Sequence, residues 1–248
     1  MTAEQTFSRP DSFQAPAPLQ IGMVIYPRLT LLDLIGPQTA LGMHGITHLV
    51  AERLEPVISD SGIALIPTTT YEECPRDLDV LFVPGGEGTA DAMEDAKLLA
   101  FLRNRAETAR YVTSVCSVSL ILAAAGVLQG YRATTHWTSL DVLTAFGVTA
   151  EAARVVSDRN RITGGGVTAG IDFGLTLLAH LRGEPVARMT QLAMEYDPQP
   201  PFDAGSPALA GEQAVRLVKQ FVAPVHLRTM QIAKAWRGPI RDDRLTVG

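Results

Sequence analysis

The stretch from Tyr111 to Gly126 constrains the fold of this chain more than any other. It begins with a short β-branched run, passes through small residues at Cys116, and continues as an Ala- and Leu-rich helical pattern. This order predicts a strand, a tight turn and a helix, with a thiol at the corner. The first N–H groups of such a helix point at the corner and favour a thiolate, so Cys116 is a candidate reactive cysteine. The alternative from this stretch alone is a small buried apolar residue, which is a common role for cysteine.

Apolar strand patterns and helical patterns alternate along the rest of the chain. The runs at residues 20–26 and 78–83 predict buried parallel strands, and helices are expected at about 96–109 and 171–181. This alternation predicts an α/β fold with a doubly wound, mostly parallel sheet flanked by helices. Shorter strands are expected at residues 47–51, 55–59, 63–67, 148–156 and 161–163, and further helices at 138–146, 186–195 and 211–235, where Pro224 could interrupt the last one.

Polar or small residues follow three of the expected strands. Asp33 lies in an apolar run after the first strand, either as a functional carboxylate or as the N-cap of a helix that starts near Asp33 or Gly36. Gly85 and Gly86 follow the second strand, where paired glycines either bring backbone N–H groups close to a ligand or form a plain turn. Because parallel strands end at the same sheet edge, these residues and Cys116 are expected to lie together.

Charge and composition argue against several classes of function. The 248 residues carry a formal net charge of -5 and no basic cluster, which argues against nucleic-acid binding. No apolar run approaches the ~18 residues of a membrane span. Two cysteines, Cys74 and Cys116, cannot form a disulfide framework, so a cytoplasmic location is expected. Residues 1–18 are polar and contain prolines, without the apolar core of a signal peptide, so we expect a disordered tail there.

Five segments of the chain carry a resemblance to a known superfamily. They are LLDLIGP (31–37), VLFVPGG (80–86), YVTSVCSVSLILAAAGVL (111–128), RATTHW (132–137) and RITGGGVTAGIDFGLTLLA (161–179). Together they resemble the ThiJ/PfpI superfamily, whose fold is a flavodoxin-like, class I glutaminase-like sandwich with a cysteine nucleophile elbow. The resemblance implies an α/β domain over residues 19–209 and a homodimer. Residues 210–248 are expected to form a C-terminal helix that packs on that domain or on a dimer partner.

The late segment QLAMEYDPQPPFDAGSP (191–207) is similar to the isocyanide hydratase branch of this superfamily. Peptidases of the superfamily have a histidine directly after the nucleophile. This chain has Ser117 there, which argues against a Cys-His peptidase. The resemblance implies that Cys116 is the nucleophile and Asp33 the general acid/base. Ser117 then replaces a threonine that handles protons or positions groups in that branch.

The resemblance also implies an oxyanion-type site made by the backbone N–H groups of Ser117 and of Gly85 or Gly86. His136 and Trp137 follow a short expected strand and are candidate substrate-binding residues. Three roles stay open for His136: a general base, an orienting group, or only a packing residue. No metal-ligand pattern is visible, so we expect no cofactor. The resemblance implies a small isocyanide as the substrate.

An isocyanide hydratase of this kind would join the thiolate of Cys116 to the terminal carbon of the substrate, and water would then release an N-substituted formamide. The apolar neighbours of Asp33 should raise its pKa by desolvation, so that its carboxyl group can donate a proton first and accept one from water later. Two alternatives stay open. One is another cysteine enzyme of the superfamily, either glyoxalase-like or hydrolytic, and the other is a non-enzymatic redox or ligand sensor.

Overall fold

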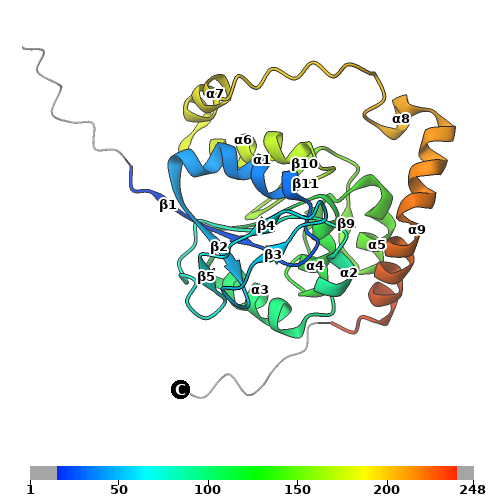
Figure 1. Cartoon of the computed structure of the whole chain (residues 1–248), viewed down its shortest axis with the longest axis horizontal. Coiled ribbons are helices and arrows are strands. Elements are labelled where there is room, and N and C mark those ends of the chain that lie inside the picture. The colour runs from blue at the N-terminus through cyan, green and yellow to red at the C-terminus, as the bar shows by residue number, and fades with distance from the viewer. Residues whose placement is uncertain (1–15, 239–248) are drawn as a thin grey trace, which may run out of the picture.

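The computed structural model describes residues 16–238, which contain a seven-stranded, mostly parallel sheet (Figure 1). In spatial order the strands are β10 (Val155–Asp158), β11 (Arg161–Gly164), β7 (Tyr111–Val115), β6 (Val80–Val83), β1 (Leu19–Val24), β2 (Gly45–Ala51) and β5 (Thr69–Thr70). Every neighbouring pair is parallel except β10 and β11, which form an antiparallel hairpin at one edge. The predicted α/β fold is therefore confirmed.

The central strands are buried because their side chains are apolar on both faces of the sheet. All four residues of β6 and five of the six residues of β1 are buried. Continuous runs of branched and aromatic residues suit strands that helices cover on both sides. Phe82 of β6 packs against Phe173 of the covering helix, with ring centroids 5.6 Å apart. The strands predicted at residues 20–26 and 78–83 are thus confirmed.

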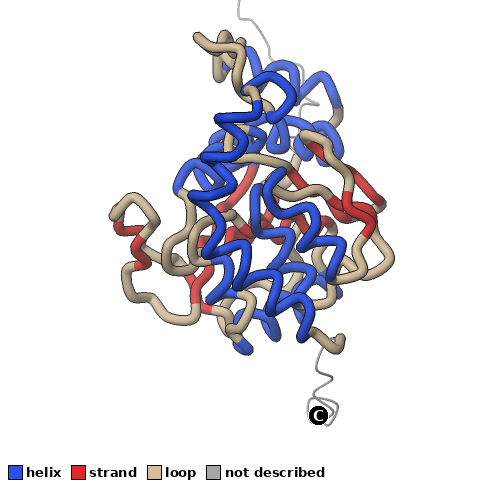
Figure 2. Tube along the Cα trace, turned by 90° about the vertical axis from the view of Figure 1, so that its right-hand side faces the viewer, coloured by secondary structure: helices blue, strands red, loops and turns tan. Residues whose placement is uncertain are grey.

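Two layers of helices cover the sheet (Figure 1). One layer contains α1 (Leu31–Leu41), α6 (Ala169–Arg182) and α7 (Glu184–Ala193), and the other contains α3 (Ala96–Thr108), α4 (Ser119–Ala124) and α5 (Leu140–Ala145). The short helices α2 (Thr89–Ala92) and α8 (Pro207–Ala210) and the long α9 (Glu212–Ala235) lie along one flank. Figure 2 looks onto this flank, with helices in front of the strands. α9 packs against α2 and α5.

The strand order creates a topological switch point between β1 and β6. From β1 the chain continues through α1 to β2 on one side, and from β6 it continues through α3 to β7 on the other side. The carboxyl ends of strands at such a point form a crevice where open α/β sheets bind ligands. Asp33 follows β1, Gly85 follows β6, and Cys116 follows β7.

Some local elements differ from the sequence predictions. The segments expected as strands at 55–59 and 63–67 form their own hairpin, β3 (Val57–Ile58) with β4 (Ala64–Leu65), outside the main sheet. The pair β8 (Arg132–Ala133) and β9 (Thr149–Ala150) is likewise separate. The edge strand β5 was not anticipated, because two threonines give little apolar signal. α9 continues through Pro224, so of the two possibilities for this helix the uninterrupted one is observed.

The predicted disordered tail lies at the N-terminal end of the chain. Most of the tail predicted at residues 1–18 lies outside the described residues, as do residues 239–248.

Candidate active site

Cys116 lies at the corner between β7 and a short 3-10 turn, Cys116–Val118, that leads into α4. Its φ angle is +67°, in the left-handed region that residues other than glycine rarely adopt. Such a conformation costs about 1–3 kcal/mol and persists only where the surroundings hold it. The Cys116 N–H donates to the Gly165 carbonyl at 2.6 Å, and the Thr135 hydroxyl donates to the Cys116 carbonyl at 2.8 Å. The predicted strand–turn–helix corner is confirmed.

Asp33 lies in the first turn of α1 and its side chain is completely buried. The thiol of Cys116 and the backbone N–H of Gly85 face its carboxyl group and lower its pKa, but burial outweighs them and raises that pKa to about 8. Neither contact has hydrogen-bond geometry, so both carboxyl oxygens lack a partner among the described residues. The expected rise in pKa is confirmed. The N-cap alternative is wrong, because α1 begins at Leu31 and its N-cap residue is Thr30.

Gly85 lies between these two side chains and sets how closely they approach. A Cβ atom at position 85 would lie 2.7 Å from the Cβ atom of Cys116 and would also collide with the carboxylate of Asp33. Only glycine leaves room for the thiol and the carboxyl group to face each other across the end of β6. The structure therefore brings together Asp33, Gly85 and Cys116, as their positions after three adjacent strands implied.

The surroundings of the Cys116 thiol disfavour its ionised form. Burial raises its pKa well above the ordinary value, and the nearby carboxyl group of Asp33 raises it further. The N–H and hydroxyl groups of Ser117 act in the opposite direction but do not compensate. The helix start acts in the expected direction, because the Ser117 N–H lowers the pKa of the Cys116 thiol, but burial and Asp33 outweigh it. A side chain that is only 7% exposed loses more hydration than these donors restore.

A chain of hydroxyl groups positions Ser117. The Thr89 hydroxyl donates to the Gly86 carbonyl at 2.6 Å and lies 2.9 Å from the Ser117 hydroxyl oxygen. Because the Thr89 proton is directed at a carbonyl, the Ser117 hydroxyl is the donor in the second contact. The Gly86 N–H in turn donates to the Ser117 oxygen at 3.4 Å, so this amide is not free for a substrate.

Two buried residues of this region were missed by the sequence interpretation. Thr89 is fully buried, and Tyr26 donates from its hydroxyl to the Pro84 carbonyl at 2.8 Å, below the glycine turn. Burial raises the pKa of Tyr26 well above its ordinary value. Their only sequence signals are a hydroxyl residue just after the glycine turn and a tyrosine at the end of the first apolar run.

His136 and Trp137 have different surroundings. His136 lines the cavity above Cys116, and its Nδ1 lies 2.7 Å from the Thr138 hydroxyl. Burial lowers the pKa of His136, which keeps the imidazole neutral. Trp137 does not line this cavity but a neighbouring cleft between α5 and α9. Of the two residues, only His136 is brought to the thiol.

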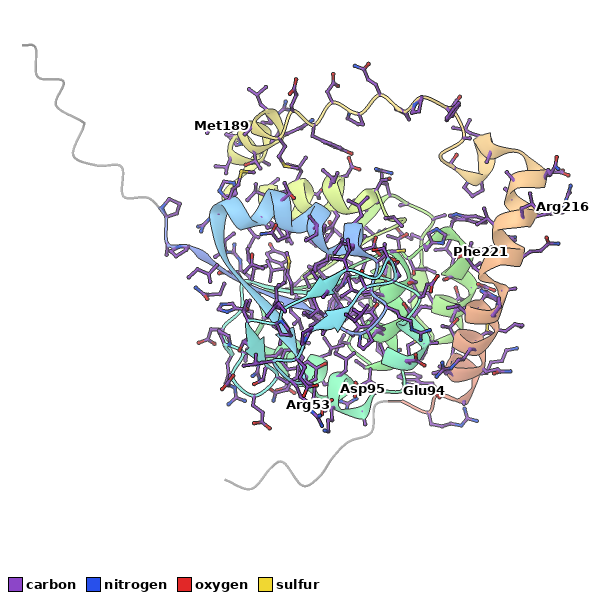
Figure 3. The ribbon with its side chains drawn as sticks, viewed as in Figure 1. Arg53, Glu94, Asp95, Met189, Arg216 and Phe221 are labelled. Carbon is purple, nitrogen blue, oxygen red and sulfur yellow. The ribbon has the colours of Figure 1, made fainter. Side chains whose placement is uncertain are left out.

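The cavity above Cys116 has a volume of about 580 Å³ and lies between the sheet edge and α9. Its sheet side includes the polar residues Thr89, Ser117 and His136. Its other side comes from α9, which the sequence interpretation did not connect with the site (Phe221 of α9 is labelled in Figure 3). The α9 residues that line it are Phe221, Val222, Val225, His226 and Thr229.

Residues 16–238 contain neither a metal-ligand cluster nor a membrane-spanning helix. In this range no group of three or more histidine, cysteine or acidic side chains is arranged to hold a metal ion. None of the helices in the same range has the length and apolar character needed to cross a membrane.

Comparison with known proteins agrees with this architecture. Residues 20–180 match the DJ-1/PfpI family. The isonitrile hydratase of Pseudomonas putida is 50% identical over 214 residues, which cover 85% of this chain and 93% of that protein.

Two solved structures extend the comparison. A ThiJ/PfpI family protein from Pseudomonas syringae has a TM-score of 0.86 and 46% identity, and the match covers 93% of this chain and 99% of that one. Drosophila melanogaster DJ-1beta has a TM-score of 0.66 and 19% identity, over 73% of this chain and 100% of that one. These matches confirm the resemblance inferred from the sequence segments: the chain belongs to the DJ-1/PfpI family.

Proposed function

We propose that this protein is an isocyanide hydratase, which converts an isocyanide, R–N≡C, and water into an N-substituted formamide. One observation carries the proposal: the neutral carboxyl group of Asp33 faces the thiol of Cys116 at the floor of a cavity. The 50% identity to an isonitrile hydratase supports this substrate class. The reaction needs a nucleophile and a proton donor, and it needs no change of oxidation state.

In the first half of the reaction, the sulfur of Cys116 bonds to the terminal carbon of the isocyanide, which also receives a proton. The product is a thioimidate, Cys–S–CH=N–R. The carboxyl group of Asp33 donates this proton and takes the thiol proton as the C–S bond forms. The net charge of the site stays unchanged, which favours this route where neither a thiolate nor a carboxylate would be hydrated.

In the second half, water adds across the C=N bond. The hydroxyl group goes to the carbon and the proton goes to the nitrogen. The adduct then breaks its C–S bond as its hydroxyl group loses a proton, and the products are the formamide and the Cys116 thiol. We assign these proton transfers to Asp33, which acts as base and acid in turn.

The remaining site residues have positioning roles in this proposal. The Ser117 N–H, which faces the sulfur, would stabilise the charge that develops at the reacting group. Gly86 and Thr89 would hold the Ser117 hydroxyl rather than bind substrate. His136 would contact the bound substrate from the cavity wall. We assign no role at the thiol to Trp137, which lines a different cleft.

We also propose that the protein is a cytoplasmic homodimer in which residues 19–209 form the catalytic domain. The segment 197–206 runs clear of the body between α7 and α8 (Figure 1), and exposed apolar side chains lie on this segment and on the helices on either side of it. Patches of this kind are rarely left open to water in a monomer. The exposed side chains, each at least 56% accessible, are Met189, Leu192, Phe202, Leu209, Leu217 and Phe221.

The direct test of the activity uses cyclohexyl isocyanide and detects N-cyclohexylformamide. Wild-type protein should form this product, and Cys116→Ala should lower the rate by about 10³-fold or more, because the covalent step is lost. The matched control is Cys74→Ala, which removes the other thiol and should leave the rate unchanged. Absence of product, or undiminished turnover in Cys116→Ala, contradicts the proposal. Conversion of methylglyoxal instead would favour a glyoxalase-like enzyme.

The pH dependence of kcat/KM tests the protonation state. Because the pKa of Asp33 is raised to about 8, the neutral carboxyl group is lost above this pH, and kcat/KM should fall as pH rises through about 8. Asp33→Asn should lower kcat/KM by about 10²-fold to 10⁴-fold and remove this titration. An increase in kcat/KM as pH rises through about 8 would contradict this assignment, because it would mean that the ionised form of Asp33 is the active one.

The same shift makes a prediction about stability. The carboxyl group of Asp33 ionises near 3.8 in the unfolded chain but near 8 in the folded protein, so folding is opposed increasingly as pH rises between these values. The full cost is about 6 kcal/mol, from ~1.4 kcal/mol for each pH unit. In urea unfolding, Asp33→Asn should therefore gain stability relative to wild type between about pH 5 and pH 8. The exposed control Asp77→Asn should not, and an equal pH response of both variants would refute the assignment.

The dimer is tested by sedimentation equilibrium. Wild-type protein should have twice the chain mass of 26.6 kDa. The double variant Leu192→Glu and Phe202→Glu should sediment as a monomer, because buried carboxylates without partners oppose association. A wild-type monomer at micromolar concentration would rule out the proposed assembly.

A further inference from the structure

α9 lies beyond the part of the chain that the family match covers. The match ends at residue 180, whereas α9 spans Glu212–Ala235. The whole of the Drosophila DJ-1beta structure corresponds to only 73% of this chain, whereas the Pseudomonas syringae structure corresponds to 93%. α9 is therefore not part of the fold segment that defines the family, although it borders the candidate active site.

One face of α9 forms a side of the cavity that is apolar over most of its length. Phe221, Val225 and Thr229 follow one another at intervals of four residues, which places them on the same face of the helix. All three line the cavity that contains Cys116. Hydroxyl and imidazole groups lie around the thiol, whereas Phe221, Val222 and Val225 give α9 an apolar stretch, which is flanked by His226 and Thr229.

The half of α9 that contains Val225 is anchored to the body of the protein. Arg228 pairs with Asp91 and with Glu94, the latter at 2.5 Å. Two residues earlier, His226 donates from Nδ1 to the Thr138 carbonyl at 3.0 Å. These contacts tie α9 to α2 and to the turn after His136, so this side of the cavity is held at a defined distance from the thiol.

The linear geometry of an isocyanide determines which part of the substrate would lie against the α9 side of the cavity. The C–N≡C unit is linear, so a substrate with its terminal carbon at the sulfur directs its R group straight away from the reacting atoms. Asp33 and Gly85 close the buried side of the sulfur, which leaves the cavity for the R group. A volume of about 580 Å³ falls within the range of about 300–1,000 Å³ that is typical of pockets for larger ligands.

We infer that α9 is the specificity wall of this enzyme and selects isocyanides with a bulky apolar R group, such as a branched or cyclic hydrocarbon. Val225 is the middle one of the three residues in register on this face, between Phe221 and Thr229. The inference rests on the proposed hydratase function for the identity of the reacting group. The shape and polarity of the wall do not depend on that identity.

The first assay compares kcat/KM for cyclohexyl isocyanide and methyl isocyanide. Val225→Ala removes two methyl groups from the wall, so it should lower the ratio of the two values by about tenfold, mainly through KM for the cyclohexyl substrate. Phe221→Ala should change the ratio in the same direction. The matched control is Val218→Ala, the same substitution two turns earlier on α9 at a residue that does not line the cavity, and its ratio should equal that of wild type.

A second assay needs no hydratase activity. In a Cys74→Ala background, Cys116 is alkylated with N-cyclohexylmaleimide or N-methylmaleimide and the rates are followed by mass spectrometry. Val225→Ala should lower the cyclohexyl-to-methyl rate ratio about tenfold, and Val218→Ala should not. Hydration with an unchanged ratio for Val225→Ala in both assays overturns the specificity wall and leaves the hydratase proposal intact. A lowered alkylation ratio without any hydration supports the wall and overturns the hydratase proposal.

Discussion

The burial of one carboxyl group against one thiol determines much of the surrounding structure. Asp33 is fully buried without a hydrogen-bond partner among the described residues, and its neutral form makes this tolerable. The same burial keeps Cys116 protonated. Two neutral acids that face each other can exchange protons with a substrate without creating a lasting charge, which suits side chains as buried as these two. The stability lost at Asp33 is thus linked to the proposed chemistry.

The fold supplies this arrangement at a single edge of the sheet. Three adjacent parallel strands end there, and the segment that follows each strand contributes one member of the site. Gly85 allows the close approach, and the strained backbone of Cys116 is held by hydrogen bonds to Gly165 and Thr135. α9 then closes the cavity from outside the family domain, so the reacting groups and the substrate wall come from separate parts of the chain.

The sequence predicted the fold and the neighbourhood of Asp33 and Cys116 because both follow from local patterns. Apolar runs identified the central strands. Residues that follow parallel strands lie at the same edge of the sheet, and this does not depend on how distant elements pack. The opposing effect of burial on the pKa of the Cys116 thiol was not anticipated, because burial depends on elements distant in the chain. For the same reason, Thr89 and the α9 residues were not anticipated as part of the site, and Trp137 was expected there although it faces a neighbouring cleft.

The central claim, that Asp33 is a neutral acid beside a neutral thiol, is tested most directly by infrared difference spectroscopy. The wild-type minus Asp33→Asn spectrum near neutral pH should contain the carbonyl band of a protonated carboxylic acid. That band should shift to the carboxylate frequencies as pH rises through about 8, following the raised pKa of Asp33. A carboxylate band already present at about pH 5, near the range of an ordinary aspartate, would contradict the account.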